Sequence, residues 1–182
     1  MNEEVNNTAC GERVIKTVCD GNGGIYTPDY KTLISCCERD EDRGKITYFR
    51  INDKCLKIGD KAFAFCHNME RIDGIENLES IGRGAFCDCH LLKDFIMPSK
   101  IVEIPSYAFY GCRALTNIGS LENVLRIHHD AFYGCMSLSE LKLPKSYISI
   151  GEDAFTRCDS IPDDVRQQLP EWREITKAKE NK

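Results

Sequence analysis

Apolar residues recur along the chain at a fixed interval of 23 residues, from Ile58 to Ile161. Each interval carries, in the same order and without a gap, an isoleucine, an Ala-Phe pair, a cysteine and an aliphatic residue, as in Ile58, Ala62-Phe63, Cys66 and Met69. A unit of 23 residues is too short to bury a core of its own. The pattern therefore predicts units that stack on one another as a solenoid.

Two shorter periodicities within each unit predict its local structure. Ala, Phe and Cys in A-F-x-x-C stand at positions i, i+1 and i+4, which places them on one side of a helical or 3₁₀ turn. Leu141 and Leu143 alternate with polar residues before Pro144, which indicates a short strand. We therefore predict an α/β solenoid of short parallel strands and helical or 3₁₀ turns, with a cap at each end because a stack exposes its terminal edges.

The chain divides into three predicted segments. Residues 1–57 form an N-terminal cap, with a β-hairpin around Pro28-Asp29, a polar loop over 38–45 and a leading strand over 46–51. Residues 58–161 form the repeat array, whose units are 58–80, 81–103, 104–126, 127–149 and the partial unit 150–161. Residues 162–182 form a C-terminal helical cap and tail, with Trp172 folding back on the last unit and a frayed end over 177–182.

The repeat resembles the BspA-like class of leucine-rich repeats, whose pattern is I-G-x-x-A-F-x-x-C-x-x-L-x-x-I-x-L-P. The segment Ile150-Gly151-Glu152-Asp153-Ala154-Phe155-Thr156-Arg157-Cys158 carries the first half of this pattern, and Leu138 to Pro144 carries the second half. The glycine of the pattern is present at Gly59, Gly82 and Gly151 but is replaced by Pro105 and His128. The resemblance implies a curved leucine-rich-repeat superhelix that binds macromolecules, and it associates the chain with adhesion to host proteins.

Charge and composition exclude several classes of function. The 182 residues include 24 Lys and Arg against 29 Asp and Glu, a net charge of −5, so no basic field is available to hold a phosphate backbone and we expect no nucleic-acid partner. No segment has the roughly 20 apolar residues of a membrane helix. Residues Met1 to Asn7 show no secretory leader, which favours the cytoplasm; a fragment, or a chain exported by another route, would lie at the cell surface or outside the cell.

The 11 cysteines raise the question of metal or redox chemistry. Five of them form the repeated column, and a residue that follows Ala-Phe in every unit has the pattern of a small buried apolar side chain. These structural cysteines are Cys66, Cys89, Cys112, Cys135 and Cys158. Paired zinc knuckles are absent from the sequence, so we expect no metal and no cofactor, and a cysteine-based metal or redox protein is the third interpretation. The neighbouring pair Cys36-Cys37 is interpreted as packing of the cap, with an oxidation-prone exposed thiol as the alternative.

No catalytic motif is found: the sequence has no nucleophile elbow, Walker loop, H-E-x-x-H helix or G-x-G-x-x-G turn. We therefore predict that the chain is not an enzyme and that its function lies on a surface. If Leu141 and Leu143 point inward, their strand neighbours point outward, and the same offset applies in every unit. The residues exposed in this way, called the strip below, are Arg71, Asp73, Asp94, Ile96, Asn117, Glu140 and Lys142.

The strip is the predicted binding surface on the concave sheet. Its partner is expected to be another protein or a glycan, and the chain is expected to be a monomer. A solvated sheet face would show the same alternation of charged and apolar residues, so the strip is a hypothesis about a surface and not about single residues. The first functional interpretation is thus a non-enzymatic protein-protein interaction module, and a cell-surface or secreted adhesin that binds host proteins is the second.

Overall fold

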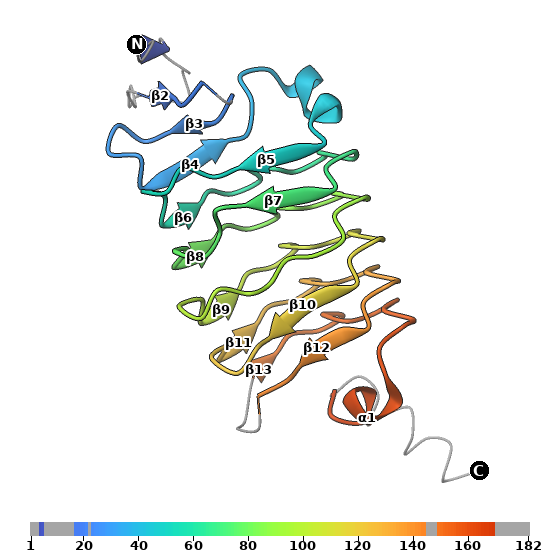
Figure 1. Cartoon of the computed structure of the whole chain (residues 1–182). Helices are drawn as coiled ribbons and strands as arrows, with labels where there is room; N and C mark the ends of the chain where they lie inside the picture. Colours follow the sequence, from blue (N-terminus) through green and yellow to red (C-terminus); the bar gives the residue numbers. More distant parts are fainter. Residues whose placement is uncertain (1–3, 6–16, 22, 145–148, 170–182) are drawn as a thin grey trace, which may run out of the picture.

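A computed structural model describes residues 4–5, 17–21, 23–144 and 149–169 of the 182-residue chain. The chain winds as a β-solenoid of about five repeat units, stacked one below the other from the N-terminus to the C-terminus (Figure 1). Each complete unit runs along two faces of the solenoid and along a turn edge that joins them. The stacked solenoid predicted from the 23-residue period is confirmed.

The first face is built from parallel strands that begin 23 residues apart. Tyr48 pairs with Arg71 and Asn117 pairs with Glu140, in the strands β5 (Tyr48–Arg50), β7 (Arg71–Asp73), β10 (Asn117–Ser120) and β12 (Glu140–Lys142). Between these two pairs, the chain contributes an isolated bridge from Asp94 to Asn117. Because side chains alternate across a strand, Ile72, Ile118 and Leu141 enter the core while their neighbours face outward.

The second face consists of very short strands, each of which directs one aliphatic residue to the core, fully buried except for the partly buried Ile150 at the C-terminal end. Its parallel members are β4 (Thr32–Ser35), β6 (Lys57–Ile58), β8 (Ser80–Ile81), β9 (Glu103–Ile104), β11 (Arg126–Ile127) and β13 (Ser149–Ile150). Strand β4 is also antiparallel to β3 (Ile25–Tyr26), which is in turn antiparallel to β2 (Thr17–Cys19), and β2 pairs with β1 (Glu4–Val5). Strands β3 and β4 are thus antiparallel on either side of Pro28 and Asp29, and β4 continues the parallel ladder.

Both ladders are interrupted at the same level of the stack. Among the described residues, no strand pairing or backbone hydrogen bond joins residues 71–81 to residues 94–104. At three other levels the residue after the second-face isoleucine donates its N–H to the preceding unit: Gly59 to Leu33 O at 2.7 Å, His128 to Ile104 O at 2.9 Å and Gly151 to Ile127 O at 2.7 Å. Pro105 occupies this position below Ile81 and has no N–H to donate. The proline thus removes a bond that is present in the ladder at three other levels.

Pro105→Ala is expected to restore this hydrogen bond, because position 105 follows Ile81 by 24 residues, the offset at which His128 donates to Ile104 and Gly151 to Ile127. The amide at position 105 should then exchange with solvent at least about tenfold more slowly than an exposed amide, as a ladder amide does. Hydrogen exchange measured by NMR checks this, with Pro28→Ala as the control because Pro28 is exposed in the hairpin turn. Equally fast exchange at positions 105 and 28 would show that the interruption has another cause.

The turn edge differs from the predicted helical or 3₁₀ turn. Residues 60–65, and their equivalents in later units, form consecutive turns and no helix. Ala62, Ala64 and Cys66 donate their N–H groups within the unit, to Gly59, Lys61 and Phe63, whereas the residues between them donate to the next unit. Those bonds run from Lys61, Phe63 and Phe65 to the carbonyls of Arg83, Ala85 and Cys87, at 2.8–2.9 Å.

The cause of this difference is backbone conformation, which the side-chain spacing does not reveal. Two positions in each turn have positive φ, as at Lys61 (56°) and Phe65 (65°), and a helix cannot continue through such residues. The turn edge is therefore a third ladder of hydrogen bonds between units. It continues at the level where the ladders of both faces are interrupted, because Gly84 donates to Ser106 O and Phe86 to Ala108 O.

The core lies between the faces as columns of repeated side chains. The phenylalanines of the Ala-Phe pairs stack with ring centroids 5.1–5.3 Å apart, in the column Phe63, Phe86, Phe109, Phe132 and Phe155. The alanine and cysteine of each unit are buried beside them. Repetition of one residue type in one register thus produces a continuous core from units that could not form one alone.

The ends of the array carry short additional elements. The segment predicted to be a polar loop contains the 3₁₀ helix η1 (Asp40–Lys45), which has no buried residue. After the last unit, α1 (Asp163–Arg166) begins directly after Pro162, near the predicted helix start. The predictions for Trp172 and for the tail over 177–182 lie outside the described residues.

Candidate functional site

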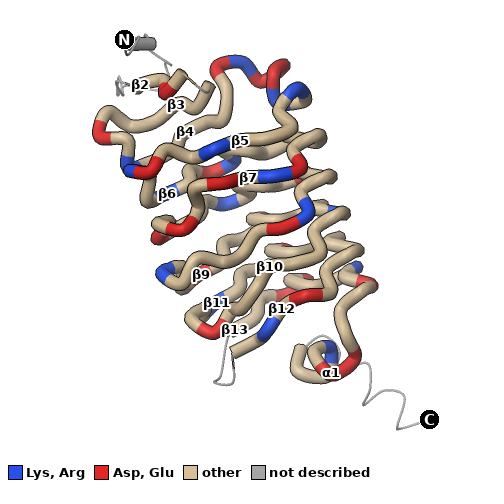
Figure 2. Tube along the Cα trace, in the orientation of Figure 1, with Lys and Arg blue, Asp and Glu red and all other residues tan. Residues whose placement is uncertain are grey.

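Charged residues of both signs lie along β7 and β12 of the first face (Figure 2). Arg71, Asp94, Ile96, Glu140 and Lys142 are exposed, while Asp73 and Asn117 are partly buried. The seven predicted strip residues therefore share one face of the solenoid, although they do not form one site. Four of them gather around a groove, and the other three continue along the face toward the C-terminus.

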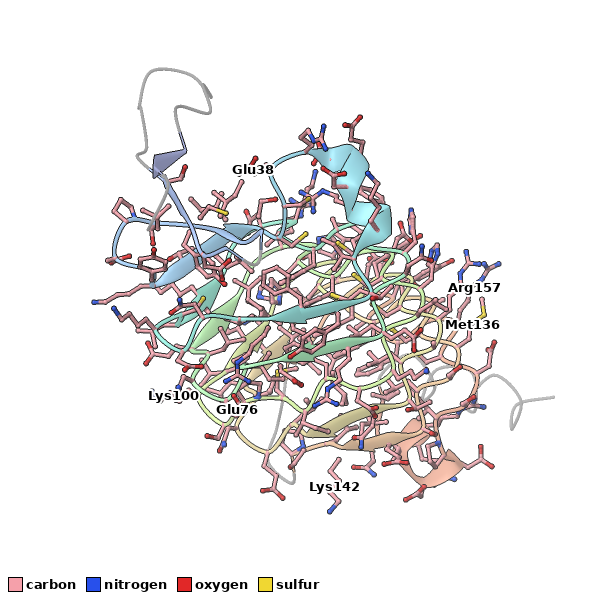
Figure 3. The ribbon with its side chains drawn as sticks, turned by 45° about the horizontal axis from the view of Figure 1, so that its top comes forward. Glu38, Glu76, Lys100, Met136, Lys142 and Arg157 are labelled. Carbon is pink, nitrogen blue, oxygen red and sulfur yellow. The ribbon has the colours of Figure 1, made fainter. Side chains whose placement is uncertain are left out.

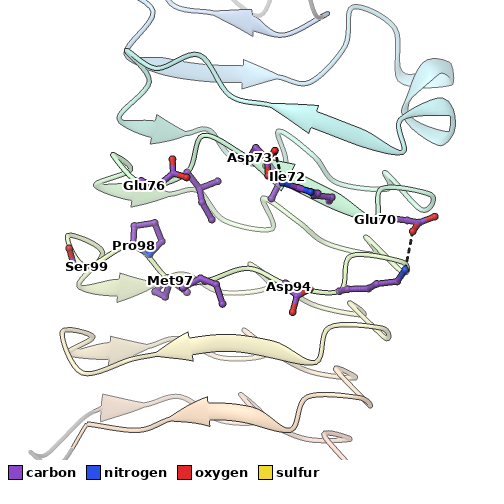
Figure 4. A pocket seen from close by; sticks show the side chains of 12 residues that line it. Glu70, Ile72, Asp73, Glu76, Asp94, Met97, Pro98 and Ser99 are labelled. Atoms are coloured by element: carbon purple, nitrogen blue, oxygen red, sulfur yellow. Dashed lines mark hydrogen bonds and ion pairs between the residues drawn. The ribbon is translucent and has the colours of Figure 1, made fainter.

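The groove lies where the ladder is interrupted, between β7 and residues 93–99 (Figure 4). Its volume is about 680 Å³, and it includes the predicted strip residues Arg71, Asp73, Asp94 and Ile96. The remaining lining comes from the same two segments: Glu70, Ile72, Ile75, Glu76, Lys93, Met97, Pro98 and Ser99. Separation of β7 from residues 94–98 thus converts part of the first face into a concave surface.

Ion pairs fix the charged side chains at one end of the groove. The Arg71 guanidinium donates to Asp73 at 2.8 Å, and the Tyr48 hydroxyl donates to the same carboxylate at 3.1 Å. The Lys93 ammonium donates to Glu70 at 3.0 Å across the interruption, as the dashed line in Figure 4 shows. Hydrogen bonding from Arg71 lowers the pKa of Asp73, so this carboxylate stays ionised at mildly acidic pH.

The side chains that line the groove carry a net negative charge. Four carboxylates line it against two cations, Arg71 and Lys93, and both cations are paired with carboxylates of the lining. Among the described residues, no ion pair involves Asp94 or Glu76. Two carboxylates are thus available to a cationic ligand.

An apolar patch lies beside these carboxylates. Ile96 is 52 % exposed, while Met97 and Pro98 next to it are buried at the floor of the groove. Gly119 of β10 leaves room for Ile96, because a Cβ at Gly119 would lie 3.1 Å from Ile96 Cγ2. A large exposed aliphatic side chain next to unpaired carboxylates is suited to contact a partner that is partly apolar and partly basic.

The other strip residues differ in what their side chains do. The Asn117 side-chain oxygen accepts the N–H of Gly119 at 2.8 Å, so it supports the irregular strand β10. Glu140 and Lys142 are exposed on β12, and Lys142 extends away from the body of the molecule in Figure 3. The structure thus brings Arg71, Asp73, Asp94 and Ile96 together and leaves Glu140 and Lys142 outside the groove.

Sequence reasoning missed several residues of this surface. Tyr48 and Arg50 stand 23 residues before Arg71 and Asp73, so extension of the period upstream would have added them to the strip. Glu70 and Lys93 precede the strand positions and contact each other only because two units are adjacent. Met97 and Pro98 line the groove because the ladder is interrupted beside them, and their sequence pattern does not indicate that interruption.

The cysteine column is a chain of buried thiols. Cys89, Cys112, Cys135 and Cys158 each direct Sγ to the carbonyl of the phenylalanine 26 positions earlier, at 3.1 Å. Burial raises the pKa of Cys89, Cys112 and Cys135, which keeps these thiols protonated as donors. Within the described part of the chain, no group of three or more His, Cys, Asp or Glu side chains is arranged to hold a metal ion.

Comparisons with known proteins agree with this architecture. The pattern of the BspA type leucine rich repeat region matches residues 41–162 in six copies. A leucine rich cell surface protein from Faecalibacterium prausnitzii is 30 % identical, with a TM-score of 0.63, over 82 % of this chain and 37 % of that protein. A leucine-rich repeat protein from Bacteroides ovatus is 27 % identical, with a TM-score of 0.50, over 72 % of this chain and 39 % of that protein.

A third solved structure shows the fold alone. It is a leucine-rich repeat protein from Eubacterium ventriosum, 20 % identical with a TM-score of 0.50, over 81 % of this chain and half of that protein. No curated protein is significantly similar to the chain. The chain therefore spans half or less of the length of these three solved relatives. Among the described residues, none of the helices has the length and apolar character needed to cross a membrane.

Proposed function

Because the chain belongs to the BspA type leucine-rich repeat family, we propose that it is a non-enzymatic interaction scaffold that binds another protein through its first face. The observation that supports this most strongly is the groove between β7 and residues 93–99, which contains four of the seven strip residues. A repeat array with an uninterrupted ladder would present a flat face. Here a cavity of about 680 Å³ combines exposed apolar surface with unpaired carboxylates.

The composition of the groove favours a particular kind of partner. Asp94 and Glu76 would pair with a lysine or arginine, while Ile96 would contact an aliphatic or aromatic side chain a few residues away. An extended basic segment of a protein carries both kinds of group at strand spacing. A neutral glycan could use the exposed apolar surface but would leave the carboxylates without a cation, so the protein partner is preferred. The chain would act as a monomer.

We expect a combined charge reversal on the strip to weaken binding strongly. In the variant Arg71→Glu, Asp94→Lys, Glu140→Lys and Lys142→Glu, the electrostatic pattern of the face is inverted while the buried residues between these positions are unchanged. Loss of several complementary contacts should lower affinity at least about 100-fold. The measurement is quantitative affinity capture with the tagged chain from the native environment, followed by mass spectrometry and titration of the recovered partner.

The matched control reverses four exposed charges on the second face and its corners: Lys57→Glu, Glu79→Lys, Glu103→Lys and Arg126→Glu. It carries the same number of changes and also conserves net charge. Recovery of the same partner by both variants at wild-type affinity would refute binding through the first face. Loss of binding in the control variant alone would assign the interaction to the second face.

A role as a cell-surface adhesin is the second candidate. It is supported by the similarity to the Faecalibacterium prausnitzii protein, which is described as a cell surface protein. The cytoplasmic location expected from the sequence gains no support from these comparisons, and we propose instead that the chain functions outside the cytoplasm. Fractionation of the source cells with an antibody to the chain tests this, since recovery in the cytosolic fraction alone would exclude an adhesin.

A further inference from the structure

Cys66 differs from the other members of the cysteine column. The four later cysteines direct Sγ to a phenylalanine carbonyl 26 positions earlier, but 26 positions before Cys66 lies Asp40, in η1. Cys66 Sγ instead lies 3.4 Å from Cys36 Sγ. The first thiol of the column therefore meets a second thiol where each of the others meets a carbonyl.

The backbone on both sides holds these two sulfur atoms together. Cys36 directly follows β4, which pairs with β6, and its N–H donates to the carbonyl of Ala62 at 3.1 Å. Cys36 and Cys66 are 1 % and 0 % exposed. A disulfide has an S–S length of about 2.05 Å, so the sulfurs need to approach by little more than 1 Å. Ordinary side-chain adjustment can supply this without a change of the strand pairing.

Arg43 supplies a positive charge beside the pair. Its Nη1 lies 3.7 Å from Cys36 Sγ, and its side chain is only 14 % exposed. The hydrogen bond from Cys36, together with the Arg43 guanidinium, lowers the pKa of Cys66, while sharing of that proton raises the pKa of Cys36. The thiolate is the form that attacks a disulfide, so the environment of Cys66 favours thiol-disulfide exchange.

We propose that Cys36 and Cys66 form a reversible disulfide bond that fastens the N-terminal hairpin to the first repeat unit. Because both sulfurs are buried in the folded chain, the exchange takes place while the chain folds or while its N-terminal end opens locally. The Cys66 thiolate then attacks a low-molecular-weight disulfide and releases one small thiol, and the Cys36 thiolate attacks the mixed disulfide at Cys66 and releases the second. Two S–H bonds of the protein are lost, one S–S bond forms, and the small disulfide takes up two electrons and two protons as two thiols. This goes beyond the binding function and is independent of it.

The position of the bond gives it a structural consequence. It joins residues 30 positions apart at the N-terminal end of the stack, where the parallel ladder passes from the hairpin to the array. A cross-link of this span restricts the unfolded chain substantially. In an oxidising environment the bond would form and hold the hairpin on the first unit, and in a reducing environment the two thiols would be free.

The experiment uses the full chain refolded in glutathione buffers that range from fully reduced to fully oxidised. Free thiols are trapped by alkylation, and the digest is analysed by mass spectrometry without reduction. We expect one dominant cross-linked peptide pair, containing Cys36 and Cys66, in the oxidised buffers. We also expect the midpoint of thermal unfolding to rise by about 10 °C on oxidation.

Two variants test whether the cross-link and the shift in thermal unfolding come from the bond between Cys36 and Cys66. Cys36→Ser should abolish both the cross-link and the oxidation-dependent shift, whereas Cys89→Ala, which changes an ordinary member of the column, should keep both. The oxidised wild type alone is sufficient if a variant does not fold. Fully alkylated Cys36 and Cys66 in every buffer would overturn the proposal. A dominant bond between Cys36 and Cys37, whose sulfurs lie 4.0 Å apart, would overturn it equally.

Discussion

Phe109→Ala is expected to lower the free energy of unfolding by about 3–5 kcal/mol, the largest loss that we predict for a single substitution. The Phe109 side chain is fully buried and lies between Phe86 and Phe132, with ring centroids 5.3 Å away on each side. It also packs edge-on against Phe95 at 5.0 Å. Truncation removes all three contacts and leaves a cavity that rigid neighbouring units cannot fill. Urea denaturation followed by circular dichroism measures the change.

Phe65→Ala is the matched control for this substitution. Phe65 lies in the turn edge, is 51 % exposed and has a φ of 65°. Loss of an exposed ring should change the free energy of unfolding by no more than about 0.5 kcal/mol. Similar losses from Phe109→Ala and Phe65→Ala would contradict the assignment of the phenylalanine column to the core.

Arg43→Ala is expected to cost about 2–3 kcal/mol, although arginine is most often a surface residue. Arg43 stands 23 residues before Cys66, at the column position that a cysteine occupies in later units. Its Nη1 donates to the carbonyls of Ala62 at 3.0 Å and Ala64 at 3.2 Å, and its Nη2 to the Ser35 hydroxyl at 3.3 Å. Removal of the guanidinium takes away the donor that the Ala64 carbonyl has at the end of the turn ladder, and it leaves the Ala62 carbonyl with the Cys36 N–H as its remaining donor.

The effect of Arg43→Ala is measured by urea denaturation under reducing conditions, so that no disulfide contributes. Arg50→Ala is the control, because Arg50 is 54 % exposed and pairs only with Asp53, at 3.2 Å, among the described residues. An exposed ion pair of this kind contributes little, so this variant should remain within about 0.5 kcal/mol of the wild type. A loss from Arg43→Ala as small as that from Arg50→Ala would show that Arg43 does not cap the array.

The fold was largely predictable because one register repeats the same buried residues. Ile, Ala, Phe and Cys return every 23 positions, and this period alone requires stacked units whose strands pair in parallel. The outward positions of Arg71, Glu140 and Lys142 follow from alternation along a strand. Both inferences depend on local periodicity, which a single sequence displays directly.

Other features could not be read from the period because they depend on contacts between units. The positive φ of Lys61 and Phe65 replaces the expected helical turn with a ladder of hydrogen bonds between units, and neither lysine nor phenylalanine is a residue type that favours positive φ. Pro105 was visible as a departure from the pattern, but its effect depends on the carbonyl of Ile81 in the preceding unit. Likewise, Arg43 and Cys36 meet the array only because β4 and η1 fold over its first turn edge.

The central claim, that the first face binds the partner at the groove, is tested most directly by site-specific photocross-linking. A benzophenone amino acid is placed at Ile96 in one protein and at Val102 in a second, two aliphatic positions that are 52 % and 46 % exposed. Ile96 lines the groove of the first face, whereas Val102 directly precedes β9 of the second face and does not line the groove. Our account predicts a covalent adduct of defined mass from position 96 alone, competed by unlabelled wild type and not by the charge-reversed strip variant. An adduct from position 102 alone, or equal adducts from both positions, would contradict it.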